Sequence, residues 1–180
     1  NVVYLRPVVS WSATNALAFS AAMESNVVNN AYGYYNSKGD LVDQSDRTGY
    51  GLTMTWNGLK NDPVDGVVLN VNTAYMDADS EQDFTAAANA LWRNFELGYI
   101  YAHNKIDDFN GVVCDNDCWI TDEGTYDIHT VHASYLIPNV MDMQNFNVYL
   151  GAYYSKIQSS EEISSDDDRY GARVRFKYYF

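Results

Sequence analysis

The last twelve residues of the chain alternate strictly between apolar and polar side chains. One face of this segment would carry Tyr170, Ala172, Val174, Phe176, Tyr178 and Phe180, and the other Arg169, Gly171, Arg173, Arg175, Lys177 and Tyr179. A period of two is the period of a β-strand, whose successive side chains point to opposite faces. The segment therefore predicts a membrane-spanning strand that ends in an aromatic residue, with lipid on one face and water on the other.

The composition agrees with a membrane protein that crosses the bilayer by strands. The chain has 180 residues, with 16 Tyr and only 3 Pro. Tyr suits a membrane boundary because its ring lies in apolar surroundings while its hydroxyl reaches water. No segment approaches the roughly 20 consecutive apolar residues of a spanning helix, so a helical membrane protein is excluded. The net charge of -13 argues against nucleic acid as a partner.

The same alternation recurs along the whole chain. It predicts nine strands over residues 3–11, 17–23, 49–56, 67–75, 84–92, 95–101, 125–137, 146–154 and 169–180. The strand at 125–137 is the least regular, because Ile128 conflicts with the face that carries Val131. No helical pattern separates the segments. Evenly spaced alternating segments predict an all-β fold, a transmembrane antiparallel up-and-down β-barrel.

Two short turns are expected to fix strand register. In Ala13-Thr14-Asn15, Asn15 can adopt the left-handed conformation of a three-residue hairpin loop, which would place Trp11 opposite Leu17. The apolar parity flips after Arg93-Asn94, and a two-residue turn there explains the flip by pairing Trp92 with Phe95. Long or acidic loops are expected over residues 26–46, 77–83, 104–124 and 159–168.

The connections also predict an orientation. Those after the odd-numbered strands are short, whereas those after the even-numbered strands are mostly long or acidic. Transmembrane barrels have short periplasmic turns and longer extracellular loops, so we expect the C-terminus in the periplasm and the long loops outside. A periplasmic aromatic girdle is then expected from Trp11, Trp56, Trp92 and Tyr135.

The odd strand count leaves two alternatives open. With the C-terminus in the periplasm, nine strands place the N-terminus outside, whereas bacterial single-chain barrels have an even number of strands. Leaving out residues 1–12 would give eight strands. We favour a single barrel domain over residues 1–180 that lacks one or more N-terminal strands and belongs to a barrel of ten or more.

The C-terminal segment Asp168-Arg-Tyr-Gly-Ala-Arg-Val-Arg-Phe-Lys-Tyr-Tyr-Phe180 resembles the last strand of Gram-negative outer-membrane porins. Residues 94–101 also resemble porin strands, and residues 6–11 have a fainter similarity to alginate-export-type barrels. The resemblance implies an outer-membrane location among outer-membrane lipid and lipopolysaccharide, with solute passage and a possible homo-oligomer. It also implies that Phe176, Tyr178 and Phe180 belong to the signal read by the barrel assembly machinery.

The predicted inward face carries the residues with most functional content. Pore-lining positions are expected at Arg6, Glu24, Glu96, Arg169, Arg173, Arg175 and Lys177. Basic residues along a pore lower the barrier for anions, which favours a passive channel for small polar or anionic solutes. Alternatively, the cations pair with Glu24 or Glu96 and fill a narrow barrel, leaving a closed structural protein that binds a partner through its loops.

Cys114 and Cys118 are the only cysteines, and we expect them to form a disulfide within one external loop. A metal site there would need two more soft ligands, and none is nearby. The loop acids are interpreted as a solvated rim rather than a divalent-cation site. No metal or cofactor is therefore expected.

One enzymatic interpretation remains open. His132 and Ser134 share a strand face, and Asn145 or Asn147 follows across the next turn, which resembles the arrangement in outer-membrane lipases and deacylases. A turn centred on residues 140–141 would place Ser134 opposite Asn147 and bring nucleophile, base and orienting group together. The apolar face of Val131, however, turns His132 and Ser134 inward, away from lipid, so two polar lumen residues are the competing interpretation.

Overall fold

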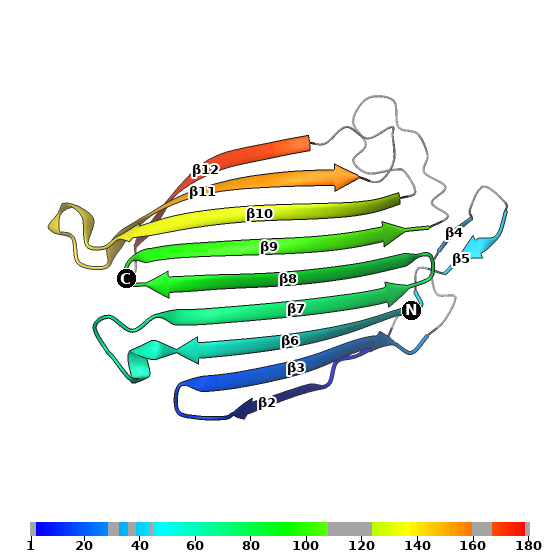
Figure 1. Cartoon of the computed structure of the whole chain (residues 1–180), viewed down its shortest axis with the longest axis horizontal. Coiled ribbons are helices and arrows are strands. Elements are labelled where there is room, and N and C mark those ends of the chain that lie inside the picture. Colours follow the sequence, from blue (N-terminus) through cyan, green and yellow to red (C-terminus); the bar gives the residue numbers. More distant parts are fainter. Residues whose placement is uncertain are drawn as a thin grey trace.

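The computed structural model describes residues 3–28, 33–35, 39–43, 45–107, 124–159 and 167–178. They form one large antiparallel sheet and a small hairpin (Figure 1). The strands of the large sheet are β1 Tyr4–Leu5, β2 Val8–Ser12, β3 Leu17–Asn26, β6 Arg47–Asn57, β7 Val68–Ala78, β8 Glu81–Trp92, β9 Phe95–Ile106, β10 Gly124–Ile137, β11 Phe146–Ser159 and β12 Asp167–Tyr178. The hairpin consists of β4 Tyr34–Tyr35 and β5 Leu41–Val42, and the 3₁₀ turns are η1 Gly58–Lys60 and η2 Val140–Asp142.

The sheet has the predicted up-and-down topology. From β3 to β12 each strand of the large sheet pairs with the next strand of that sheet, β3 with β6 across the intervening hairpin, while β1 and β2 both pair with β3. These two short strands form one edge strand interrupted at Pro7, which has no N–H to donate but accepts from the Met23 N–H at 3.1 Å. The prediction of nine strands is therefore confirmed for the described residues, and the hairpin within residues 3–28 is formed.

The sheet is open in this structure, with β2 and β12 at opposite edges (Figure 1). We call the end with the connections at 13–16, 58–67, 93–94 and 138–145 the turn end, and the opposite end the loop end. Both β2 and β12 run towards the turn end, so direct pairing between them would be parallel. An antiparallel seam would need an odd number of strands between them.

The two faces of the sheet differ in chemistry. We call apolar face the side that carries Leu52, Val71, Leu97, Leu150 and Val174, and polar face the side that carries Asn70, Asn89, Glu96, Ser134 and Arg173. Large side chains of the apolar face are open, with Leu97 exposed to 49% and Val174 to 56%. Among the described residues only Ala16, Val42, Tyr126 and Val148 are buried apolar side chains. The sheet is thus a single layer whose apolar face requires an apolar environment.

The first hairpin differs from its predicted register. Trp11 pairs with Phe19, not with Leu17, and the two rings stack with centroids 5.2 Å apart. The prediction of a left-handed Asn15 is also wrong, because Asn15 is not among the residues with positive φ. Instead the Thr14 Oγ1 accepts hydrogen bonds from the Ala16 and Leu17 N–H groups, at 3.2 and 3.0 Å. The Thr14 side chain thus provides the acceptor for two backbone N–H groups at this four-residue loop, in which no residue is left-handed.

The acidic run at 77–83 is strand and tight turn rather than a loop. β7 continues to Ala78 and β8 starts at Glu81, and Ser80 has a φ of 62°. At the turn end, the connections 58–67 with η1 and 138–145 with η2 are longer than this tight turn at the loop end. Connection length therefore separates the two ends less sharply than the sequence indicated.

Two other predictions about strands are confirmed. Arg93-Asn94 is a two-residue turn that pairs Trp92 with Phe95, with Arg93 at a φ of 51°. β10 is continuous and pairs along its length with β9 and β11. Ile128 lies on the polar face of β10, which explains why it interrupted the apolar pattern.

Candidate functional site: the polar face of the sheet

The basic residues of the last strand lie together on the polar face. Arg169, Arg173, Arg175 and Lys177 alternate along β12 and stand opposite Ser155, Gly151, Tyr149 and Asn147 of β11, respectively. Two of the four have partners. The Arg169 Nε donates to Asp167 at 2.9 Å, and the Lys177 Nζ lies 5.6 Å from the centroid of the Tyr149 ring.

Arg173 and Arg175 differ from their neighbours on the strand. Both are exposed, and neither has an ion pair or hydrogen bond to any residue that the structure describes. Gly151, opposite Arg173, has no side chain that could cover the guanidinium. These two cations are therefore available to a molecule that reaches the polar face.

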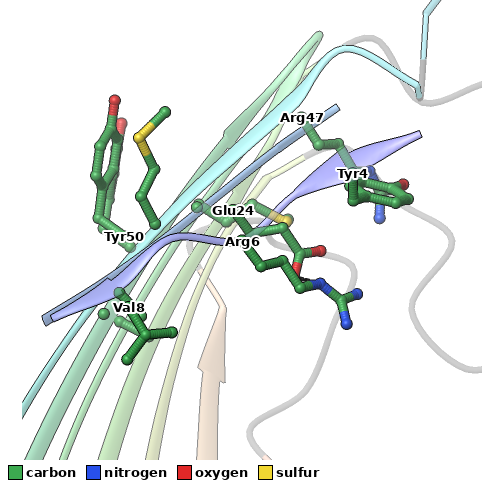
Figure 2. A pocket seen from close by; sticks show the side chains of 13 residues that line it. Tyr4, Arg6, Val8, Glu24, Arg47 and Tyr50 are labelled. Atoms are coloured by element: carbon green, nitrogen blue, oxygen red, sulfur yellow. Dashed lines mark ion pairs between the residues drawn. The ribbon is translucent and has the colours of Figure 1, made fainter. Parts of the chain in front are cut away.

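Arg6 and Glu24 lie at the opposite edge of the sheet, where they form an ion pair. Figure 2 shows Arg6, Glu24 and Tyr4 on one side of the sheet and Tyr50 on the other. The pair joins the β1–β2 edge strand to β3. Glu24 is thus engaged with Arg6 and not with the basic residues of β12.

Glu96 is the centre of a polar cluster that spans three strands. Its carboxylate accepts from the Asn89 Nδ2 at 2.8 Å and from the Ser134 Oγ at 3.0 Å. The His132 Nε2 lies 3.9 Å from the Oε1 of the same Glu96 carboxylate. The His132 ring occupies the space above Gly98, where an added Cβ would collide with it. Glu96 was predicted from the sequence as a pore-lining residue, but its partner Asn89 was not, because their contact depends on the β8–β9 register.

The cluster does not have the arrangement expected for a hydrolase. Ser134 pairs with Gly151 of β11, so the prediction that it faces Asn147 is wrong. The Ser134 hydroxyl donates to Glu96, and His132 approaches the same carboxylate. In a nucleophile–base–acid relay the histidine stands between the serine and the acid. Here the acid stands between them.

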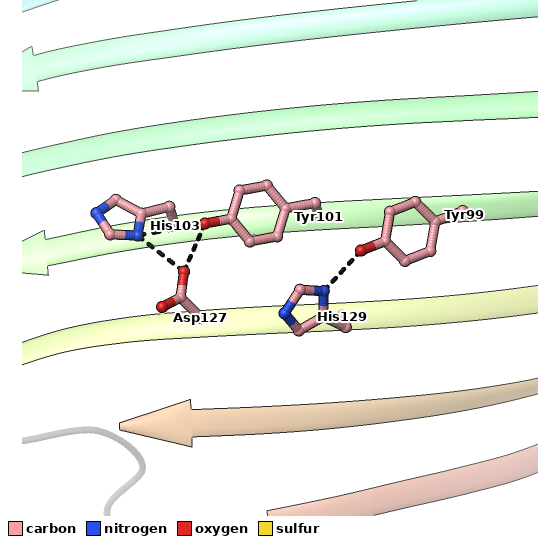
Figure 3. A network of polar contacts seen from close by, with 5 residues as sticks. All are labelled: Tyr99, Tyr101, His103, Asp127 and His129. Carbon is pink, nitrogen blue, oxygen red and sulfur yellow. Dashed lines mark hydrogen bonds and ion pairs between the residues drawn. The ribbon is translucent and has the colours of Figure 1, made fainter. Parts of the chain in front are cut away.

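A second network, which sequence analysis missed, lies on the apolar face near the loop end. Figure 3 shows Asp127 of β10 between His103 and Tyr101 of β9. The Asp127 Oδ1 accepts from the Tyr101 hydroxyl at 2.6 Å and lies 2.8 Å from the His103 Nδ1. The Tyr99 hydroxyl lies 2.6 Å from the Nδ1 of His129. These polar groups indicate where the face stops being suited to hydrocarbon.

Aromatic residues border the apolar face at both ends. Trp11, Trp56, Trp92 and Tyr135 lie at the turn end, where the sequence predicts a girdle, and Phe176 and Tyr178 of β12 join them. A second row at the loop end consists of Tyr50, Tyr75, Phe84, Tyr101, Tyr154 and Tyr170. Two aromatic rows around an apolar band are typical of a transmembrane barrel wall.

Several predicted features fall outside the described residues. They are Cys114 and Cys118, Phe180 and the acids of residues 108–123 and 160–166. In the described part of the chain, no group of three or more His, Cys, Asp or Glu side chains could hold a metal ion. No helix among these residues is long and apolar enough to cross a membrane.

An up-and-down sheet with one apolar face, one polar face and two aromatic rows has the features of a membrane β-barrel wall. The chain matches the family described as "Porin-like glycoporin RafY" over residues 1–180, and it belongs to that family. It is therefore an outer-membrane porin of Gram-negative type, and this membership indicates a channel rather than an enzyme. Two further comparisons, with curated proteins and with solved structures, returned no match.

Proposed function

We propose that the polar face lines a water-filled pore with a preference for small anions. The observation that carries this proposal is the pair of exposed guanidinium groups at Arg173 and Arg175, which lack a carboxylate partner among the described residues. Two unit charges 4 Å apart interact by about 1 kcal/mol in bulk water and about 4 kcal/mol at an effective dielectric constant of 20. Cations on a protein wall therefore attract passing anions more strongly than cations in free solution.

Two features support a pore over a closed barrel. The two carboxylates predicted as alternative partners of these cations contact other residues, because Glu24 pairs with Arg6 and Glu96 accepts hydrogen bonds from Asn89 and Ser134. The polar face also contains glycines with open space above them, among them Gly49, Gly51 and Gly151. Narrow barrels are filled by their interior side chains, and glycines fill no space.

A neutral sugar is the second candidate solute. The family description contains the word glycoporin. The Glu96 cluster offers carboxylate, amide, hydroxyl and imidazole groups, which can exchange hydrogen bonds with the hydroxyls of a sugar. Tyr149 and Tyr153 add ring faces on the neighbouring strand.

The topology of the porin in its membrane belongs to the same proposal. The turn end faces the periplasm and the loop end the exterior, where a Cys114–Cys118 disulfide braces one loop. The sheet is part of a single barrel of ten or more strands that forms homo-oligomers. Its apolar face contacts outer-membrane lipid and lipopolysaccharide, and Phe176, Tyr178 and Phe180 are read by the barrel assembly machinery.

Conductance in planar bilayers across a salt gradient tests the proposal. We expect single-channel currents with an anion-selective reversal potential, and a shift towards zero selectivity in the Arg173→Gln, Arg175→Gln double variant. Lys60→Gln is the control, because it removes one positive charge from η1, which lies outside the strands of the polar face. It should leave the selectivity unchanged. Absence of current would contradict the pore, and cation selectivity would contradict the anion preference. Sugar entry measured by liposome swelling would support the second candidate.

A further inference from the structure

We infer that Arg173 and Arg175 form a two-point site for small organic dianions, in particular dicarboxylates that can hold their carboxylates several ångströms apart. The inference rests on the proposed pore and adds a solute class to it. The spacing of the two cations, their lack of partners among the described residues, the boundaries of the site and the chemistry of the guanidinium group all favour such a ligand.

The spacing follows from the strand. Arg173 and Arg175 are two positions apart on β12 and therefore project from the same face. With a rise of about 3.4 Å per residue, their Cα atoms are separated by about 7 Å. Their guanidinium groups repel each other, and an anion with two charges can neutralise both.

The two cations are free where their neighbours are engaged. Among the described residues, Arg169 donates to Asp167 and Lys177 lies over the Tyr149 ring, whereas Arg173 and Arg175 have no such contact. The polar face thus offers two adjacent free guanidinium groups on β12.

Neighbouring aromatic rings limit the site along the strand. Tyr153 covers Gly171, since a Cβ added at Gly171 would lie only 2.6 Å from the Tyr153 Cε1. Tyr149 stands opposite Arg175 and is in contact with Lys177. Between the two tyrosines lies Gly151, directly opposite Arg173, where no side chain stands above the backbone. The open space therefore lies beside the two free cations.

The chemistry of guanidinium favours carboxylates. Its planar fork can donate two parallel hydrogen bonds to one carboxylate, which a lysine ammonium cannot do with the same geometry. A dicarboxylate can engage one fork at each end, and the second contact then forms intramolecularly at a high effective concentration. The carboxyl carbons of extended adipate are roughly 6 Å apart, from standard bond lengths. Malonate has the same charge but is too short, and hexanoate has only one carboxylate.

Block of the chloride current through single channels in planar bilayers tests the inference. We expect adipate to halve the current at a concentration roughly tenfold lower than malonate or hexanoate, because only adipate gains the second contact. Arg173→Gln and Arg175→Gln should each remove this advantage. Arg169→Gln is the matched control, since it changes a cation of the same strand and face that already has an acidic partner, and it should preserve the advantage.

The possible results separate the inference from the proposed function. A chloride current that adipate, malonate and hexanoate block at equal concentrations would refute the dianion site and leave the anion channel standing. Persistence of the adipate advantage in Arg173→Gln would also refute it. The absence of any chloride current would reject the pore and, with it, the site. The comparison of the three anions on the unaltered protein does not depend on the folding of any variant.

Discussion

A glycine on the polar face leaves room for a neighbouring side chain to pack against the backbone. Gly98 provides the space for the His132 ring, and that ring position brings the His132 Nε2 to 3.9 Å from Glu96. We expect Gly98→Ala to displace the imidazole and destabilise the protein by about 1–3 kcal/mol, the usual cost of overpacking. Unfolding in urea should show the loss.

Gly51→Ala is the matched control for this substitution. A Cβ at Gly51 would lie 3.9 Å from its nearest neighbour, the Thr73 carbonyl oxygen, which is ordinary contact. We expect a change much smaller than that of Gly98→Ala. Equal effects at the two sites would contradict the packing of His132 against Gly98.

Asp62 provides a pH-dependent contact in the turn-end connection. Its carboxylate accepts from the Asp65 and Val64 N–H groups at 3.0 and 3.1 Å, and these bonds hold the pKa of the Asp62 carboxyl below its ordinary value of 3.8. Because the folded pKa is the lower one, the contribution to stability is complete at neutral pH. It is lost as the pH falls below 3.8 and through the folded pKa.

We therefore expect Asp62→Ala to lower the urea midpoint at pH 7 and to have a smaller effect at strongly acidic pH. Asp62→Asn keeps a carbonyl acceptor without the charge, so it should remain closer to the unaltered protein at pH 7. A difference between Asp62→Ala and the unaltered protein that is the same at both pH values would rule out the linkage.

At the scale of strands and turns, the sequence was most informative where one face meets an apolar environment. The period of two predicted nine strands, and the parity flip at Trp92 and Phe95 identified the turn between them. The acidic run at 77–83 was wrongly predicted as a loop, because polar residues beyond the aromatic row are compatible with both a loop and a protruding strand. The Glu96 cluster was only partly visible, since its contacts join residues from three strands.

The tight turn between β7 and β8 depends on the left-handed backbone conformation of one residue, Ser80. Ser80 has a φ of 62°, a region that β-branched residues strongly disfavour. We expect Ser80→Val to destabilise the protein by about 1–2 kcal/mol, whereas Ser80→Gly should be tolerated. Equilibrium unfolding of the refolded protein measures both variants. A Val variant as stable as the Gly variant would contradict the left-handed turn.

For the whole molecule, channel activity depends on which face of the sheet contacts water. The apolar face carries exposed Leu, Val and aromatic side chains, and the polar face carries Arg173, Arg175 and the Glu96 cluster. The proposed function places the first face against lipid and the second against the water of the pore, as in other outer-membrane barrels. Neighbouring residues of one strand must therefore differ in their access to solutes in the channel.

The most direct test is thiol modification during single-channel recording. In a background with Cys114→Ser and Cys118→Ser, a charged, membrane-impermeant thiol reagent is applied to Arg173→Cys and, separately, to Val174→Cys. The account predicts a stepwise change of current for Arg173→Cys and none for Val174→Cys, because adjacent residues of β12 face pore and lipid. Equal modification of both, or modification of Val174→Cys alone, would contradict the assignment of the polar face to the pore.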